Sequence, residues 1–134
     1  MKLVQVQPNY IHQHWDKVSP FIQDSIVKSN SDFTLEQARL LLVQGTWILI
    51  VVMNGNVVNG CLCITFINNP NARLAVITAI GGYLIVANDT WNQLKEMLRK
   101  FGATSIQGAA RPSIARLWRR LGFIEKHVIV EKEL

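Results

Sequence analysis

Cysteine and histidine are scarce in this sequence, which limits disulfide and metal chemistry. The two cysteines, Cys61 and Cys63, stand two residues apart in a segment that we expect to be a strand. At that spacing their side chains share one face and are held too far apart for an easy disulfide. His12 and His14 point to nearly opposite sides of the helix predicted around them, so they form no ligand pair. We therefore expect buried thiols in a reducing compartment and no metal site.

Long apolar runs are also lacking, which argues against a membrane protein. The longest, residues 47–53, is far shorter than the roughly 20 residues that cross a bilayer. The first residues alternate apolar and polar side chains and contain no apolar core of a signal peptide. Charged residues make up 17% of the chain and hydrophobic residues 49%, which excludes a disordered protein. We expect a single cytoplasmic domain over residues 1–134, with no membrane partner.

Acidic residues are outnumbered by basic ones, and the net charge of +5 favours anionic partners. Arg116, Arg119 and Arg120 stand at i, i+3 and i+4 of a predicted helix, with Arg111 at its start. This cluster is either a solvated helix face or a phosphate-binding surface. The pattern argues against nucleic acid as a partner, because few aromatic residues are interleaved with the arginines.

The pattern of apolar residues and turn signals predicts ten elements. Strands are predicted at residues 1–7, 46–53, 57–67, 73–80, 104–110 and 125–133. Helices are predicted at residues 11–26, 34–44, 89–100 and 112–121. Pro20 interrupts the first helix, which is therefore kinked or divided into two short helices.

The order of these elements, β-α-α-β-β-β-α-β-α-β, predicts an α/β fold of the α+β type with a mixed sheet. Asn54-Gly55 is a strong hairpin signal, so the strands on either side of it should be antiparallel. The strand, helix and strand across residues 73–110 form a crossover unit, which makes its two strands parallel.

One segment in the last quarter of the chain resembles a family motif. Residues 111–123 read R-P-S-I-A-R-L-W-R-R-L-G-F. They are similar to N-x-x-A-x-x-L-Y-x-K-x-G-F, a motif of the GNAT superfamily of acyltransferases. Leu117, Arg120, Gly122 and Phe123 fit the motif, and the predicted element order resembles that of the whole GNAT fold. The resemblance implies transfer of an acetyl group from acetyl-CoA to a primary amine.

More narrowly, the sequence resembles small GNAT-like proteins of tailed phages and prophages. The cues are Thr34-Leu35-Glu36, Gly45-x-Trp47, Asn69-Pro70, Gly81-Gly82 with Trp91, and the Gly-x-x-Arg of residues 108–111. This resemblance implies a phage virion or a host protein as a further possible partner.

The resemblance also implies where acetyl-CoA binds. The central strands should separate after Ile80 and leave a V-shaped gap for the pantetheine arm. The cofactor-binding residues that it implies are Ile77, Ala79, Ile80, Gly81, Gly82, Arg111 and Arg116. The glycines and the strand would offer backbone groups to the arm, and the two arginines would face the phosphates.

Three positions depart from the family pattern. The pyrophosphate loop Q/R-x-x-G-x-G/A is reduced to Gly81-Gly82, and Arg111 stands where the family has Asn. Trp118 stands where the family often has a tyrosine that acts as general acid. Because an indole N–H is a donor but not a usable acid, that role is vacant or has moved.

No general base stands out, and the function therefore remains open between alternatives. The candidate catalytic residues are Glu36, Tyr83, Asp89 and His127, each of which also has a structural interpretation, such as a helix cap or a half-buried strand residue. The first hypothesis is a GNAT-type acetyltransferase. The alternative is a catalytically inactive GNAT-like phage structural or host-interaction protein. A nucleic-acid-binding accessory domain is a third and weaker hypothesis.

Overall fold

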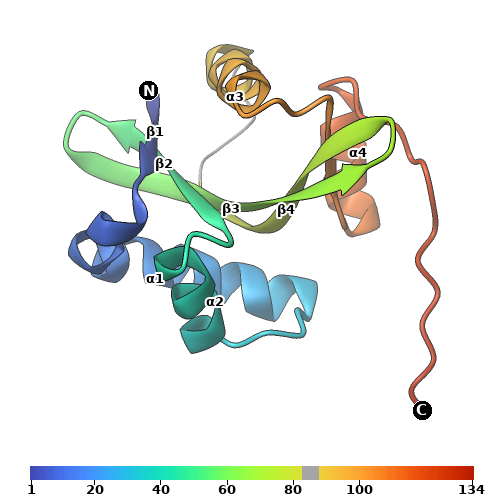
Figure 1. Ribbon diagram of the computed structural model, residues 1–134, viewed down its shortest axis with the longest axis horizontal. Helices are drawn as coiled ribbons and strands as arrows, with labels where there is room; N and C mark the ends of the chain where they lie inside the picture. Colours follow the sequence, from blue (N-terminus) through green and yellow to red (C-terminus); the bar gives the residue numbers. More distant parts are fainter. Residues whose placement is uncertain (83–87) are drawn as a thin grey trace.

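The computed structural model describes residues 1–82 and 88–134 (Figure 1). Its strands are β1 Lys2–Val6, β2 Ile48–Asn54, β3 Val57–Asn69, β4 Ala72–Gly82 and β5 Ser105–Gly108. Its helices are α1 Ile11–Ser29, α2 Leu35–Val43, α3 Asn88–Lys100 and α4 Pro112–Arg119, with a short 3-10 helix, η1, at Pro8–Tyr10. Within these ranges, no helix is both long enough and apolar enough to cross a membrane.

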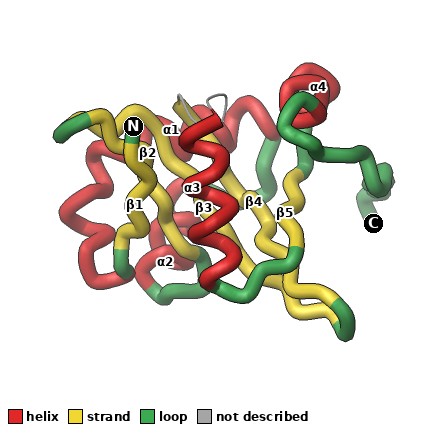
Figure 2. The backbone as a smooth tube through the Cα atoms, turned by 90° about the horizontal axis from the view of Figure 1, so that it is seen from above, coloured by secondary structure: helices red, strands yellow, loops and turns green. Residues whose placement is uncertain are grey.

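The five strands form one sheet in the order β1-β2-β3-β4-β5 (Figure 2). The pairs β1–β2, β2–β3 and β3–β4 are antiparallel, whereas β4 and β5 are parallel. The mixed sheet and the parallel strands around α3 were both predicted from the sequence, and both are confirmed. The Asn54-Gly55 hairpin is also confirmed, because Asn54 pairs with Val57 and Gly55 has a φ of +60°.

Helices cover both faces of the sheet, with α1 and α2 on one face and α3 on the other (Figure 1). Successive residues of β2 therefore enter different cores: Leu49 and Val51 pack toward α1 and α2, whereas Ile50 and Val52 pack toward α3. This arrangement explains why the central strands read as continuous apolar runs, since both faces of each strand exclude water.

The start of α2 follows its local sequence closely. The backbone N–H of Gln37 donates to Thr34 Oγ1 (3.2 Å), and the backbone N–H of Thr34 donates to Gln37 Oε1 (2.9 Å). This is the capping box that the Thr-x-x-Gln spacing predicts.

The final strand predicted at residues 125–133 is absent from the structure, so the predicted element order was wrong at its last position. This segment has no regular secondary structure and is exposed along its length. Alternation of apolar and polar residues suits a strand, but a strand exists only where a partner completes its hydrogen bonds. In the described chain β5 pairs only with β4, and no segment pairs with its other edge.

The first helix is one continuous element of 19 residues with Pro20 inside it, so its division into two short helices was wrong. Pro20 is exposed, and the carbonyl group that loses its helical hydrogen bond there can be solvated. The buried residues Ile11, Trp15, Val18 and Ile22 lie on both sides of the proline. Their packing on the sheet holds the two halves together.

Candidate functional site

The parallel strands β4 and β5 separate at one end of the sheet. Their last paired residues are Ile77 and Gly108, whereas β4 continues to Gly82. After Gly108 the chain turns toward α4, which begins at Pro112. Among the described residues, the backbone edge of β4 beyond Ile77 therefore has no neighbouring strand on the β5 side.

A β-bulge in β4 lies where this separation begins. Cys63 pairs with Ala79 and Ile64 pairs with Ile77, so Thr78 is an extra residue. The Thr78 hydroxyl donates to the carbonyl of Cys63 (3.1 Å). As a result, Ile77 packs toward α3 and Ala79 packs toward α1, although residues two apart in a regular strand share one face. The bulge thus redirects the end of β4.

A cavity of about 230 Å³ occupies the gap between the strands. The residues that line it come from the last turns of α1, the end of β4, the segment after β5, α4 and the turn that follows α4. They are Asp24, Ser25, Lys28, Ser29, Ile80, Gly81, Gly82, Ala109, Ala110, Arg111, Ile114, Leu117, Trp118 and Leu121.

Helix α1 packs directly against the end of β4 and forms one wall of the cavity. The backbone N–H of Ile80 donates to Ser25 Oγ (3.1 Å), and Ser25 is 6% exposed. A Cβ atom on Gly81 would lie 2.5 Å from the carbonyl oxygen of Phe21. Only glycine fits here, because the clash would be with helix backbone rather than with a movable side chain.

Apolar side chains of α4 form the opposite wall, and Trp118 is the aromatic residue among the described lining. Trp118 is buried, and a Cβ atom on Gly108 would lie 2.7 Å from its ring. The ring centroids of Trp118 and Phe123 are 5.2 Å apart, and those of Trp91 and Phe123 are 5.3 Å apart. Trp118 is therefore both a core residue and part of the cavity wall.

Three charged residues lie at the edge of the cavity. Lys28 Nζ is 2.9 Å from Asp24 Oδ2, in an exposed ion pair one turn apart on α1. Arg111 is the exposed N-cap residue of α4. Because Lys28 and Asp24 offset each other, Arg111 leaves this rim with an excess positive charge.

The structure brings together four of the residues predicted to bind a cofactor. Ile80, Gly81, Gly82 and Arg111 all line the cavity. The other three do not line it: Ile77 pairs with β5, Ala79 is buried toward α1, and Arg116 is exposed on α4.

The resemblance also implied a substrate groove walled by the first two helices, and residues of α1, but none of α2, are among those that line the cavity. Sequence reasoning did not identify which residues of α1 these are. The available signal was Ser25, a small polar residue on the same stripe as the buried residues Val18 and Ile22. A buried serine requires a hydrogen-bond partner, and here the partner is the backbone of β4.

The candidate catalytic residues do not gather at the cavity. Glu36 is exposed in the first turn of α2, and His127 is exposed in the C-terminal segment. Asp89 is exposed on α3, where its Oδ2 accepts a hydrogen bond from Gln93 Nε2 (3.0 Å). Tyr83 lies outside the described residues. Among the lining residues that the structure describes, Asp24 is the single carboxylate.

The two thiols are buried in the core between the sheet and α1. Burial raises the pKa of Cys61 to about 12, and burial together with the nearby Cys61 raises the pKa of Cys63. Both groups are therefore protonated at neutral pH and poor nucleophiles. In the described ranges, no three His, Cys, Asp or Glu side chains are grouped so that they could hold a metal ion.

Comparison with protein-family models gives no match. No curated protein matches the sequence significantly. Solved structures do match, over nearly the whole chain. A probable acetyltransferase has a TM-score of 0.72 and 15% identity, with 100% of this chain and 97% of that chain covered.

Two further structures agree with this match. A predicted acetyltransferase from Clostridium acetobutylicum, solved with acetyl-CoA, has a TM-score of 0.68 and 11% identity, with coverage of 98% and 95%. An aminoglycoside acetyltransferase from an uncultured soil metagenomic sample, in complex with sisomicin, has a TM-score of 0.69 and 15% identity, with coverage of 99% and 95%. None of the three is described as a phage protein, so the narrower resemblance stays a prediction. The chain has a GNAT-like acetyltransferase fold.

Proposed function

We propose that the cavity at the end of β4 binds acetyl-CoA and that the protein transfers the acetyl group to a primary amine. The observation that supports this most directly is the position of the cavity. It lies where β4 and β5 separate, and it is lined by the strand end Ile80-Gly81-Gly82. A matching solved structure contains acetyl-CoA.

The unpaired edge of β4 suits a chain of amides such as pantetheine. Beyond Ile77, the N–H and C=O groups on this edge have no strand partner on the β5 side. An extended ligand with amide groups would take the place of that strand, as a peptide does when it adds to a sheet edge. The Ile80 N–H is not among these groups, because it already donates to Ser25 Oγ.

The size and charge of the cavity indicate which parts of such a ligand would lie inside it and which would lie outside. Its volume of about 230 Å³ is below the roughly 300–1,000 Å³ typical of sites that enclose a whole small molecule. In this proposal the acyl group and part of the arm are enclosed, and the phosphates lie outside near Arg111. A guanidinium group is well suited to phosphate, because its donors match two phosphate oxygens at once.

The proposed reaction requires little more than alignment. The amine nitrogen attacks the thioester carbonyl carbon, the carbon–sulfur bond breaks, and the nitrogen loses a proton as the departing sulfur gains one. Holding the two reactants in the correct orientation supplies a large part of the rate enhancement. Asp24 is paired with Lys28 and so offers no free base for the amine, and Trp118 supplies no acid for the sulfur. We therefore expect slow turnover.

The test is an acetylation assay with acetyl-CoA and a panel of primary amines that includes aminoglycosides and a lysine peptide. The proposal predicts release of free CoA that depends on both the amine and the protein. Release at the same rate without an amine, or no release with any acceptor, would contradict an acetyltransferase.

A second candidate function is binding without catalysis. It is favoured by two features of the described cavity lining: the single carboxylate is paired with Lys28, and Trp118 stands where an acid is expected. Binding of acetyl-CoA without turnover would select this candidate. A role as a phage structural or host-interaction protein would be a particular case of it, and rests on the sequence resemblance alone.

A further inference from the structure

The C-terminal segment, residues 124–134, carries an unusual amount of exposed apolar surface. Its large apolar residues are Ile124 (81% exposed), Val128 (87%), Ile129 (80%), Val130 (89%) and Leu134 (114%). The segment is extended and projects away from the sheet beyond α4, as Figure 1 shows. Monomeric proteins rarely leave so much apolar surface in water within one short segment, so this surface is suited to binding a partner.

The two faces of the segment differ when it is considered as a strand. Ile124, Val128, Val130 and Leu134 fall on one face, which also includes two lysines. The opposite face contains Glu125, His127, Ile129, Glu131 and Glu133. This period-two pattern is typical of a strand with one face buried and the other in solvent. The face of Val128 and Val130, called the even face below, is the one suited to burial.

The sheet has a free edge that such a strand would complete. β5 pairs with β4 on one side, and no described segment pairs with its other side. The side chain of Ile106 in β5 packs against the core between the sheet, α3 and α4. An added strand with its apolar face on that side would extend this core beyond Ile106. An unpaired edge also exposes backbone donors and acceptors that favour strand addition.

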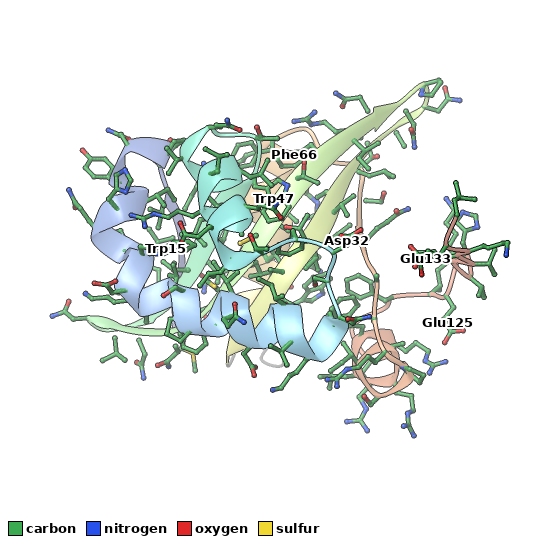
Figure 3. All side chains as sticks on the ribbon, turned by 90° about the horizontal axis from the view of Figure 1, so that it is seen from below. Trp15, Asp32, Trp47, Phe66, Glu125 and Glu133 are labelled. Atoms are coloured by element: carbon green, nitrogen blue, oxygen red, sulfur yellow. The ribbon has the colours of Figure 1, made fainter. Side chains whose placement is uncertain are left out.

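The segment does not lie along the β5 edge of its own chain. Phe123 is held by the rings of Trp91 and Trp118, so the segment leaves the core from a fixed point. Arg119 Nη1 then pairs with Glu125 Oε1 (3.1 Å). In Figure 3 the labelled Glu125 and Glu133 lie outside the sheet and apart from its strands. These contacts direct the segment outward from the core of its own chain.

We propose that two copies of this chain form a dimer by exchanging residues 124–134, each segment pairing with the β5 edge of the other copy. Each chain carries both a free strand and a free edge, so a reciprocal exchange satisfies both and leaves neither exposed. The interaction is closed by two-fold symmetry and does not propagate into a fibre. This inference does not depend on acetyl-CoA binding or on catalysis.

The test combines molar mass with hydrogen exchange. Size-exclusion chromatography with light scattering should give about 30 kDa for the full chain, twice its mass of 15.2 kDa. Backbone amides within residues 124–133 should be protected from exchange, because pairing with β5 engages them. The double variant Val128→Asp/Val130→Asp places two charges on the even face and should give a folded monomer with unprotected amides in this segment.

The matched control is His127→Asp/Ile129→Asp, which places two charges at the same spacing on the opposite face. This variant should remain a dimer. A monomeric full chain would overturn the proposal. Protected C-terminal amides in that monomer would indicate that the segment pairs with β5 of its own chain, and unprotected amides would indicate that it pairs with no strand. A dimer that persists unchanged in the Val128/Val130 variant would overturn it as well.

Discussion

Arg111 and Arg116 are close in the sequence, yet they lie in different positions relative to the cavity. Arg111 lines the cavity beside the end of β4, whereas Arg116 lies on the exposed surface of α4 and outside the lining. Sequence reasoning treated the two as equivalent partners for phosphate. The structure distinguishes them and supplies a matched pair of variants.

Arg111→Ala should weaken acetyl-CoA binding by about fivefold, which is the upper range for an exposed ion pair of roughly 1 kcal/mol. The effect should decrease as salt is added, because screening weakens exposed pairs. Arg116→Ala is the control and should change affinity less. Calorimetric titration of both variants at low and high salt measures this, and equal losses would show that Arg111 has no special place at the cavity.

Trp118 contributes to the packing of the core and also lines the proposed binding site. Its ring contacts Gly108 and Phe123 and also forms part of the cavity wall. Trp118→Tyr would place a hydroxyl group there. If donation of a proton to the departing sulfur limits turnover, the rate should rise by about 10- to 100-fold. The change should also lower the free energy of unfolding by about 1 kcal/mol through lost contacts.

The control for this substitution is Trp47→Tyr. Trp47 packs against Phe33 in the core on the α1 and α2 face, away from the cavity. It should alter stability without raising the rate of acetylation. Fast turnover of the unmodified protein that Trp118→Tyr leaves unchanged would show that no acid is missing at this position.

At the scale of elements, the contact between α1 and β4 determines the shape of the site. Gly81→Ala should destabilise the fold by about 1–3 kcal/mol, because its Cβ would meet the backbone oxygen of Phe21 and helix and strand would have to separate. Gly108→Ala should cost less, since its clash is with the edge of the Trp118 side chain. Urea denaturation of the two variants gives the comparison. A Gly81 variant as stable as the unmodified chain would disprove the close contact.

Most elements could be predicted because their signals are local. The Asn54-Gly55 turn, the Thr34 capping box and the apolar stripe of α1 each act within a few residues. The bulge at Thr78 could not be predicted, because it reverses the faces of a strand whose sequence reads as regular. Residues 125–133 show the opposite case, since their sequence is suited to a strand but pairing depends on a partner elsewhere.

The candidate site was predictable only in part, for a related reason. Ile80, Gly81 and Gly82 were found because they form the end of one strand, and Arg111 because it starts a helix motif. Asp24, Ser25 and Lys28 come from an element that is distant in the sequence. Their place at the cavity follows from how α1 crosses the sheet, which no local pattern encodes.

At the scale of the whole molecule, two helical layers enclose a sheet that opens at one end. The cavity lies at that opening, and the C-terminal segment leaves from the neighbouring helix α4 (Figure 2). The candidate site and the proposed dimer contact thus lie at the same side of the sheet. They are nevertheless separable, because the cavity lining ends at Leu121 and the exchanged segment begins at Ile124.

The central claim is that this opening binds acetyl-CoA, and calorimetric titration of the full chain with acetyl-CoA tests it most directly. The account predicts saturable binding of one acetyl-CoA per chain that is weakened by Arg111→Ala and little affected by Arg116→Ala. Absence of any binding heat with millimolar acetyl-CoA, at two temperatures and with a correctly folded protein, would contradict it.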